Sequence, residues 1–364
     1  MERPTRSIEE KGMSALSART PGKHIAFRYF TPAKRRATQY EEVTLHIQWA
    51  PQNYATQGYF NRDVHNNPSW YPESTALKAQ DWWAYRDPCE EWYRPFVDRQ
   101  AAIGLAIEQA IAGAKRASMY RHIAPAWSCF LTDHYALYRY PDYGLFMCQC
   151  HVQRDALSDV VSAPTVFQAL EKDRHAQDVA LYCMELESLL PGYSDETAMT
   201  RWMESPAWQP TRRLVEQLLA CRDWGEVHLA INLVVEPLVS TLLSRELVLR
   251  YAPHYGDSVT PVIEQGVEAD REMRQASAKA LVSFLLTQDG GNRDTINRWL
   301  ETWAPRAVEA VAAFAPVFAE LDADPQAFAA ARERLLAQWA ALLAELQLQF
   351  PATVQLPAAE GAPA

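Results

Sequence analysis

The chain has 364 residues, of which 48% are hydrophobic and 22% charged, and its formal net charge is −10. This composition is typical of a soluble globular protein with a large core, and the acidic balance argues against a nucleic-acid-binding protein, which needs a basic face. The N-terminal stretch lacks the apolar run of a signal peptide and the six cysteines follow no disulfide framework, so we expect a cytoplasmic protein with free thiols.

Residues 1–80 predict an extended arm rather than a folded domain. The segment is rich in proline, asparagine and aromatic residues, no helical period runs through it, and short stretches such as EEVTLHIQW (41–49) indicate extended chain. Since disordered segments are usually poor in aromatic residues, we expect the arm to dock on its own body or on a partner. The basic run at 34–36 is interpreted as a solvated turn rather than a binding patch.

An aromatic cluster, DWWAYRDPCEEWYRP (81–95), follows the arm. Aromatic side chains and arginine are common anchors of protein interfaces, and a helix start that packs on the protein's own body is an equally good interpretation. Together with the arm, this cluster supplies the candidate residues for a partner interface. They are Arg35, Arg36, Tyr40, Trp49, Trp70, Trp82, Trp83 and Trp92.

Residues 81–321 predict a helical core. Apolar residues recur at helical spacing in two long segments; they are Ile103, Ile107 and Ile111 in the first, and Leu170, Leu181, Met184 and Leu189 in the second. Stop signals such as PGYSDET and SPAWQP separate the helices. The most apolar stretch, residues 228–249, contains Glu236, Arg245 and Glu246, which are costly in lipid. It therefore predicts a buried helix of a soluble protein.

Residues 322–350 predict one amphipathic helix, and residues 351–364 predict a disordered tail. Phe328, Leu335 and Leu342 recur every seven residues, with Trp339 and Leu346 offset by four. The stripe is too short for a free coiled coil, so we expect it to be a docking face. The tail is rich in alanine and proline.

No histidine in the sequence has an acidic residue three positions before it. A ferritin-like di-iron site needs two Glu-x-x-His pairs and two further glutamates. In the segment EKDRH (171–175) the residue three before His175 is Lys172, which brings a positive charge to a ligand position. Glu171 and His175, four residues apart, are interpreted as an ion pair across one helical turn, or His175 as an exposed histidine.

Other chemical motifs are weak. The cluster CQCH places Cys148, Cys150 and His151 one residue short of the usual zinc spacing, and no second pair accompanies it, so we expect buried free cysteines. No Gly-x-Ser-x-Gly elbow and no phosphate-binding loop is present in the sequence. A catalytic group assembled from dispersed residues stays open.

Several segments, in their order and spacing, resemble the β subunit of the hydroxylase component of soluble bacterial multicomponent monooxygenases. They are RRATQYEEVT, PSWYPESTALKAQDWWAYRDPCEEWYRP, YGLFMCQCHVQRDALSDV, AQDVAL, LPGYSDET, DWGE, RELVLRYAPHYGDSVTP and RWLETW. The resemblance spans about residues 27–321. Some segments are similar to the methane and short-chain alkane or alkene branch, and PAKRRATQYEEVT and SPAWQPTR are similar to the propane branch, so the substrate stays open.

The resemblance implies an all-α, ferritin-like (ribonucleotide-reductase-like) helical bundle with an extended N-terminal arm. It implies a non-catalytic structural subunit, without catalytic, metal or cofactor-binding residues of its own, that braces an α subunit. That partner carries the di-iron centre and hydroxylates or epoxidises a small hydrocarbon with O2. Further implied partners are a γ subunit in an α2β2γ2 assembly, a regulatory protein, and a reductase that supplies electrons from NADH. No nucleic acid and no membrane are expected.

Two other functions stay open at this point. The chain could be a ferritin-like metalloenzyme with its own noncanonical metal site around Glu171, His175 and Glu185. It could also be a free-standing helical interaction module.

Overall fold

The computed structural model describes residues 27, 29–46 and 71–355, and these residues form helices and connecting segments without strands. The α-helices are α2 (Tyr93–Arg116), α3 (Pro125–Asp133), α4 (Arg139–Asp155), α5 (Asp159–Leu189), α6 (Ala198–Glu204), α7 (Gln209–Ala220), α8 (Trp224–Ala230), α9 (Thr260–Gln288), α10 (Gly291–Ala312), α11 (Ala315–Leu321) and α12 (Ala327–Glu345). The π- and 3-10 helices are η1 (Glu41–Leu45), η2 (Pro72–Ser74), η3 (Trp82–Ala84), η4 (Met119–His122), η5 (Tyr135–Leu137), η6 (Ile231–Ser240), η7 (Leu242–Leu249) and η8 (Ala252–Tyr255). The predicted all-α class is confirmed.

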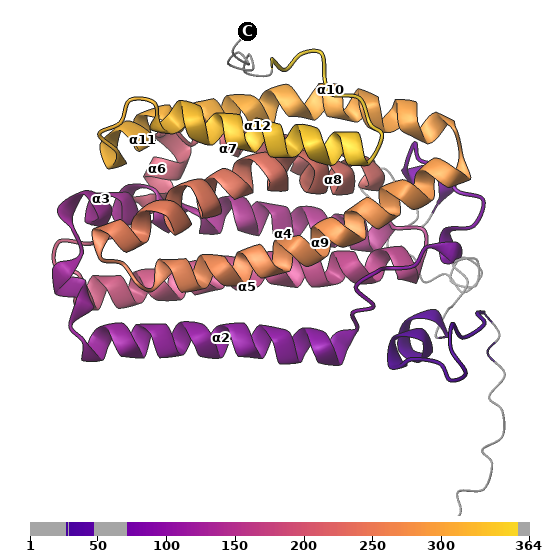
Figure 1. Ribbon diagram of the computed structural model, residues 1–364, viewed down its shortest axis with the longest axis horizontal. Helices are drawn as coiled ribbons and strands as arrows, with labels where there is room; N and C mark the ends of the chain where they lie inside the picture. Colours follow the sequence, from indigo (N-terminus) through magenta and orange to yellow (C-terminus); the bar gives the residue numbers. More distant parts are fainter. Residues whose placement is uncertain (1–26, 28, 47–70, 356–364) are drawn as a thin grey trace, which may run out of the picture.

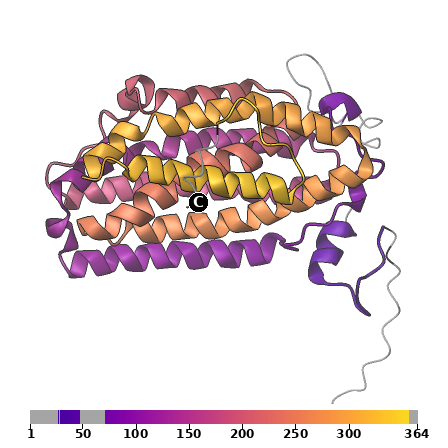
Figure 2. The ribbon, with the colours of Figure 1, turned by 45° about the horizontal axis from the view of Figure 1, so that its top comes forward.

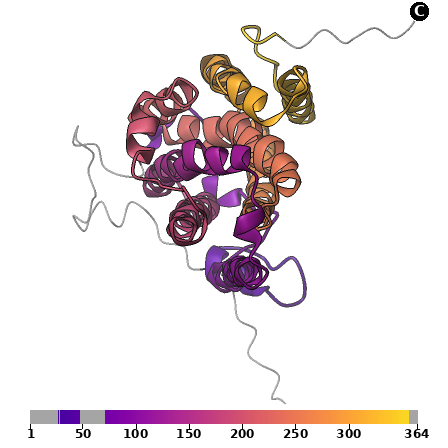
Figure 3. The same cartoon turned by 90° about the vertical axis from the view of Figure 1, so that its left-hand side faces the viewer.

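The long helices form one bundle. Helices α4 and α5 pack against each other along their lengths, α9 packs on α5 and η7, and α10 packs on η6 and α7. Figure 1 shows these helices running along the long axis, and the end-on view of Figure 3 shows them clustered around the α8–η6–η7 helix. Helix α2 is the outermost long helix of the bundle in Figures 1 and 2, and only Phe96, Ile107 and Ala114 of its residues are buried.

The bundle is built around a continuous helix from Trp224 to Tyr255, formed by α8, η6, η7 and η8. It is long and apolar enough to cross a membrane, but its apolar window is 89% buried inside the fold, as expected for a core helix. Asp223 caps its start by accepting hydrogen bonds from the backbone N–H groups of Gly225 (2.9 Å) and Glu226 (3.1 Å). The predicted buried helix at 228–249 is therefore present.

Proline interrupts the hydrogen bonding of this core helix. Pro237 has no N–H, so the α-helical bond to the carbonyl of Leu233 cannot form, and the helix runs as a π-helix here. The carbonyl of Leu233 accepts a 2.6 Å hydrogen bond from Nε1 of Trp339, and the carbonyl of Glu236 accepts one of 2.8 Å from the Thr241 hydroxyl. These side chains satisfy backbone groups in the region that the proline disturbs.

Helix α12 docks on the core of its own chain. Leu335, Trp339 and Leu342 are buried, and the helix packs on η6. The predicted amphipathic helix at 322–350 therefore exists with narrower bounds and buries its apolar stripe. Residues 351–355 of the predicted tail are ordered against α10, where the backbone N–H of Ala352 donates to Glu301 at 2.7 Å. Residues 356–364 lie outside the described residues.

The arm contains a helical turn that the sequence interpretation missed. Residues 41–45, expected to be extended, form η1, so that expectation is wrong for them. Thr38 and Glu41 make a reciprocal capping box: the Thr38 hydroxyl accepts from the Glu41 N–H at 3.1 Å, and the Glu41 carboxylate accepts from the Thr38 N–H at 2.7 Å. The signature Thr-x-x-Glu was readable in the sequence.

Helix α5 turns its apolar stripe outward. Leu170, Leu181 and Met184 are 42%, 61% and 67% exposed. The helix predicted from their spacing is confirmed, but the spacing did not tell which side of it is buried. The side that faces the bundle carries Val179 and Tyr182, and with them a group of charged residues.

Candidate functional site

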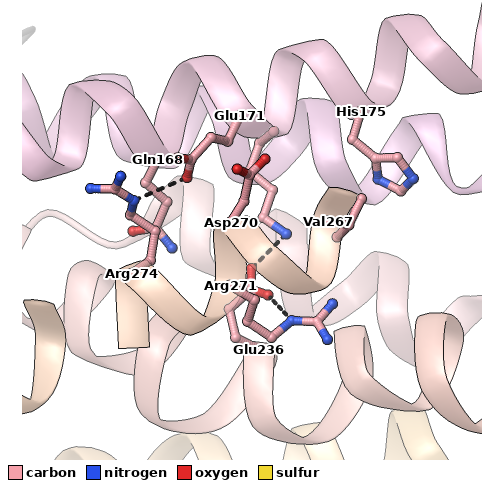
Figure 4. Close-up of a pocket in the computed structure, with 9 residues that line it drawn as sticks. Gln168, Glu171, His175, Glu236, Val267, Asp270, Arg271 and Arg274 are labelled. Atoms are coloured by element: carbon pink, nitrogen blue, oxygen red, sulfur yellow. Dashed lines mark hydrogen bonds and ion pairs between the residues drawn. The ribbon is translucent and has the colours of Figure 1, made fainter. Parts of the chain in front are cut away.

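Charged side chains from four helices meet in the interior of the bundle and form the central cluster. Each of them is at least about nine-tenths buried. The members are Asp142 on α4, Lys172 and His175 on α5, Glu236 on η6, and Glu264, Glu268 and Arg271 on α9. Figure 4 shows part of the cluster around a small cavity, with Arg271 reaching Glu236 across the helices.

Two cations hold the acidic groups of the central cluster. The Nζ atom of Lys172 lies 2.6 Å from Oε1 of Glu236 and 3.3 Å from Oδ1 of Asp142. The Nε atom of Arg271 lies 3.0 Å from Oε2 of Glu236, and its guanidinium also pairs with Glu268. Glu236 therefore places one carboxylate oxygen on each cation. Burial alone lowers the pKa of Lys172, but Asp142 and Glu236 outweigh this effect and raise it.

His175 is held as an imidazolium between two acids. Its Nδ1 pairs with Asp142, and its Nε2 lies 3.0 Å from Oε1 of Glu264. Burial by itself lowers the pKa of His175, whereas the carboxylates of Glu264 and Asp142 raise it, and the net result is about 9. At neutral pH both ring nitrogens donate. His175 is neither exposed nor paired with Glu171, so both sequence interpretations of this segment were wrong.

Glu171 belongs to a second buried group, the peripheral cluster. Its carboxylate lies 2.7 Å from Arg99 on α2 and 3.1 Å from Arg274 on α9, and the second contact is visible in Figure 4. Glu91 pairs with both of these arginines, and Asp270 pairs with Arg99. This cluster ties α2 and the segment before it to α5 and α9.

The noncanonical metal site considered from the sequence is not assembled. Glu171 and His175 serve different clusters, and Glu185 pairs with Lys115 at 2.5 Å on the partly exposed side of α5. Among the described residues, no group of three or more histidine, cysteine and acidic side chains is arranged to hold a metal ion.

The central cluster does not fit a carboxylate di-metal centre. Such a centre needs carboxylates with free oxygen lone pairs and histidines with an unprotonated ring nitrogen. Here the ammonium of Lys172 and the guanidinium of Arg271 stand among the carboxylates, and His175 uses both ring nitrogens as donors. A metal ion would meet positive charge where it needs ligands.

The candidate interface residues are dispersed over the start of the chain. Arg35 and Arg36 are exposed, whereas Tyr40 is buried within its own chain. Trp82, Trp83 and Trp92 are half-buried, and the Trp82 ring packs edge-on against Trp224 with centroids 5.4 Å apart. Trp49 and Trp70 lie outside the described residues. Packing on the body thus occurs, and the interface role stays a prediction.

The cysteines of CQCH are free thiols. Cys148 is buried and Cys150 half-buried, as the sequence indicated for the first of them. Nδ1 of His151, beside them, lies 3.4 Å from the carboxylate of Asp155 one helical turn away, and the Asp155 side chain is buried. Burial raises the pKa of the Cys148 thiol to about 12, which keeps it protonated and unreactive.

The fold and the central cluster define a class of protein: a ferritin-like helical bundle with charged residues from four helices at its centre and cations in place of metal ligands. The chain belongs to the methane/phenol/alkene hydroxylase family, whose family model matches residues 62–289.

Characterised relatives cover nearly the whole chain. It is 33% identical to the small subunit of the propane 2-monooxygenase hydroxylase component of Mycolicibacterium goodii, over 90% of each chain. It is 26% identical to the beta chain of methane monooxygenase component A of Methylococcus capsulatus, over 85% of this chain and 84% of that one. A solved chain of the phenol hydroxylase of Pseudomonas sp. OX1 has the same fold, with a TM-score of 0.72, 20% identity and coverage of 96% and 99%.

Proposed function

We propose that this chain is the β, or small, subunit of the hydroxylase component of a soluble di-iron monooxygenase. It braces the iron-bearing α subunit and carries no active site itself. The observation that carries the proposal is the central cluster, in which Lys172 and Arg271 neutralise the carboxylates that a metal centre would need. The relatives support it, because they are named small subunits and beta chains of hydroxylase components. A metalloenzyme with its own site is disfavoured by the same charges.

The chain acts as part of an oxidoreductase complex. In the proposed assembly, α, β and γ subunits form α2β2γ2 in the cytoplasm, with a reductase that passes on electrons from NADH and a regulatory protein. The α subunit hydroxylates or epoxidises a small hydrocarbon with O2. The contribution of this chain is mechanical: a metal centre on the partner's helices stays precise when those helices are clamped from outside.

The exposed apolar stripe of α5 supports a surface for the α subunit. Leu170, Leu181 and Met184 return to one side of α5, and Tyr143 and Met147 on the adjacent α4 are 54% and 44% exposed. A row of exposed apolar side chains on one side of a helix is typical of an interaction site. Since the relatives are subunits of hydroxylase components, we assign the exposed sides of α5 and α4 to contacts with the α subunit. The arm, with Arg35 and Arg36, is proposed as a second contact.

Co-expression with the α and γ chains tests the proposal. We expect one stable complex on size exclusion, with iron in proportion to α and none in this chain when it is purified alone. The double variant L181D/M184D should fold normally and weaken co-purification at least ten-fold. The matched control is L219D, on α7, where Leu219 is 48% exposed; its complex should remain intact. Iron bound stoichiometrically to the isolated chain, or no association with α, would contradict the proposal.

A further inference from the structure

Helices α5 and α9 each carry an incomplete ligand pair. A four-helix di-metal centre takes a Glu-x-x-His pair from each of two helices. Helix α5 presents Lys172-x-x-His175 and α9 presents Glu268-x-x-Arg271, all four facing the bundle interior. Each pair keeps one residue of a ligand type and has a cation at the other position.

The two pairs face each other in register. Two ion pairs tie α5 to α9 beside them: Glu171 to Arg274 at 3.1 Å, and Arg174 to Asp270 at 3.1 Å. Residue numbers rise along α5 as they fall along α9, so the helices are antiparallel. This register sets the lysine of one pair opposite the arginine of the other. Two Glu-x-x-His pairs would face one another in the same way.

The remaining two helices supply the single acids. A di-metal centre takes one glutamate from each of them, and here Asp142 stands on α4 and Glu236 on η6. Glu236 has Oε1 on Lys172 at 2.6 Å and Oε2 on Arg271 at 3.0 Å. A carboxylate with one oxygen on each of two cations is the arrangement of a bridging ligand between two metal ions.

We infer that Lys172 and Arg271 occupy two ligand positions of a di-metal site and place their positive charges where the two metal ions would lie, and that restoring a ligand at each of these two positions is enough to form the site. The restored set would be Asp142, Glu236, Glu268 and His175 with a glutamate at 172 and a histidine at 271. The inference concerns this chain's own residues and stands apart from its association with a partner.

The surroundings of His175 suit a ligand role once the cations are gone. A metal-bound histidine usually donates its outer ring N–H to a carboxylate. Here Nε2 lies 3.0 Å from Oε1 of Glu264, while Nδ1 pairs with Asp142, a member of the restored ligand set. With Lys172 replaced by an acid, a metal ion at the centre would displace the proton from Nδ1.

The test is the double variant K172E/R271H in the full chain, titrated with Co(II) in the absence of other metals. We expect two tightly bound Co(II) per chain, visible absorption bands of Co(II) bound to nitrogen and oxygen ligands, and a melting temperature that rises with added metal. The wild type should bind at least a hundred-fold more weakly. Iron content of the variant provides a second readout.

Three control variants separate ligand restoration from charge removal. K172E and R271H each restore only one pair, and each should bind Co(II) at least ten-fold more weakly than the double variant. K172Q/R271Q removes the same cations without adding ligands, and it should show no stoichiometric binding. Equal binding by this glutamine variant would overturn the inference, because removal of the cations would then suffice.

The double variant is decisive even when it is unstable. It places an additional carboxylate among buried acids, so we expect it to be poorly folded without metal and to regain the wild-type helical signal with Co(II). A variant that stays unfolded in metal, or one that folds and binds none, overturns the inference. Failure of the chain to associate with α and γ would leave this result unchanged, so the two proposals fail independently.

Discussion

Helices α5 and α12 both carry an apolar stripe at helical spacing, but they turn it in opposite directions. In α12 the stripe faces the core, and Leu335 and Trp339 are each 1% exposed. In α5 the stripe faces outward, with Leu181 61% exposed, and the inner side carries Lys172 and His175. Periodicity tells which residues share a side of a helix. Which side is buried depends on whether the neighbouring helices present apolar or charged side chains to it.

The neighbours of the two helices differ in kind. Helix α12 meets η6, where Trp339 finds a carbonyl acceptor in Leu233. Helix α5 meets Asp142, Glu236 and Glu264 from three other helices, and its buried cations are neutralised there. A buried charge is tolerated only with a partner. The inverted orientation of α5 is therefore a property of the bundle, and its outward stripe becomes available for another subunit.

Among these substitutions, the largest loss of stability is expected when a cation is removed from the buried side of α5. K172M removes one of the two cations that each of the buried carboxylates of Asp142 and Glu236 contacts, and only His175 and Arg271 remain beside them. We expect a loss of about 3–5 kcal/mol in the free energy of unfolding. The matched control is K279M, which breaks a lysine–glutamate pair to Glu345 with side chains 32% and 55% exposed. That surface pair should contribute at most about 1 kcal/mol. Equal losses of unfolding free energy for K172M and K279M, measured by urea denaturation, would contradict this difference between the buried and the surface pair.

A second comparison uses the same substitution on both stripes. L335A on α12 removes a side chain that is 1% exposed, and we expect a loss of about 2–5 kcal/mol. L181A on α5 removes one that is 61% exposed, and it should change stability by less than about 0.5 kcal/mol. Thermal melts of the two variants against wild type measure the difference. A large loss for L181A would mean that α5 buries its stripe in the isolated chain.

The pH dependence of stability should distinguish His175, which lies among charged residues, from the other buried histidines, His134 and His228. The pKa of His175 is raised from 6.5 to about 9. Its contribution is fully present below about pH 6.5 and is lost as pH rises through 9, by up to about 3 kcal/mol. Denaturant midpoints between pH 6.5 and 9.5 measure this loss, which should be absent in H175Q. An equal decline in that variant would place the effect elsewhere.

The stability linked to His134 and His228 should change with pH in the opposite direction to that linked to His175. Burial lowers the pKa of each to about 4, with Arg201 adding to the effect at His134. They are neutral in the folded chain, so the stability linked to them is present above about pH 6.5 and is lost as pH falls toward 4. The histidines together predict a maximum of stability near pH 6.5, and the fall of the unfolding midpoint between pH 6.5 and 4 should be shallower in H228Q than in the wild type.

The sequence by itself determined the helical class, the buried helix at 228–249 and the docking helix near the C-terminus, because period, stop signals and composition are local properties. It also determined that no intact Glu-x-x-His pair exists, since that is a matter of spacing along one chain. The Thr38–Glu41 capping box was equally local and was overlooked.

Only the tertiary structure decided what the segment at 171–175 does. Glu171 and His175 are neighbours on one helix, yet one pairs with Arg99 and Arg274 and the other with Asp142 and Glu264. These partners stand on other helices, as much as 103 positions away in the sequence. The role of a buried charged residue depends on the charged residues that pack against it, and the packing of the helices brings these residues together.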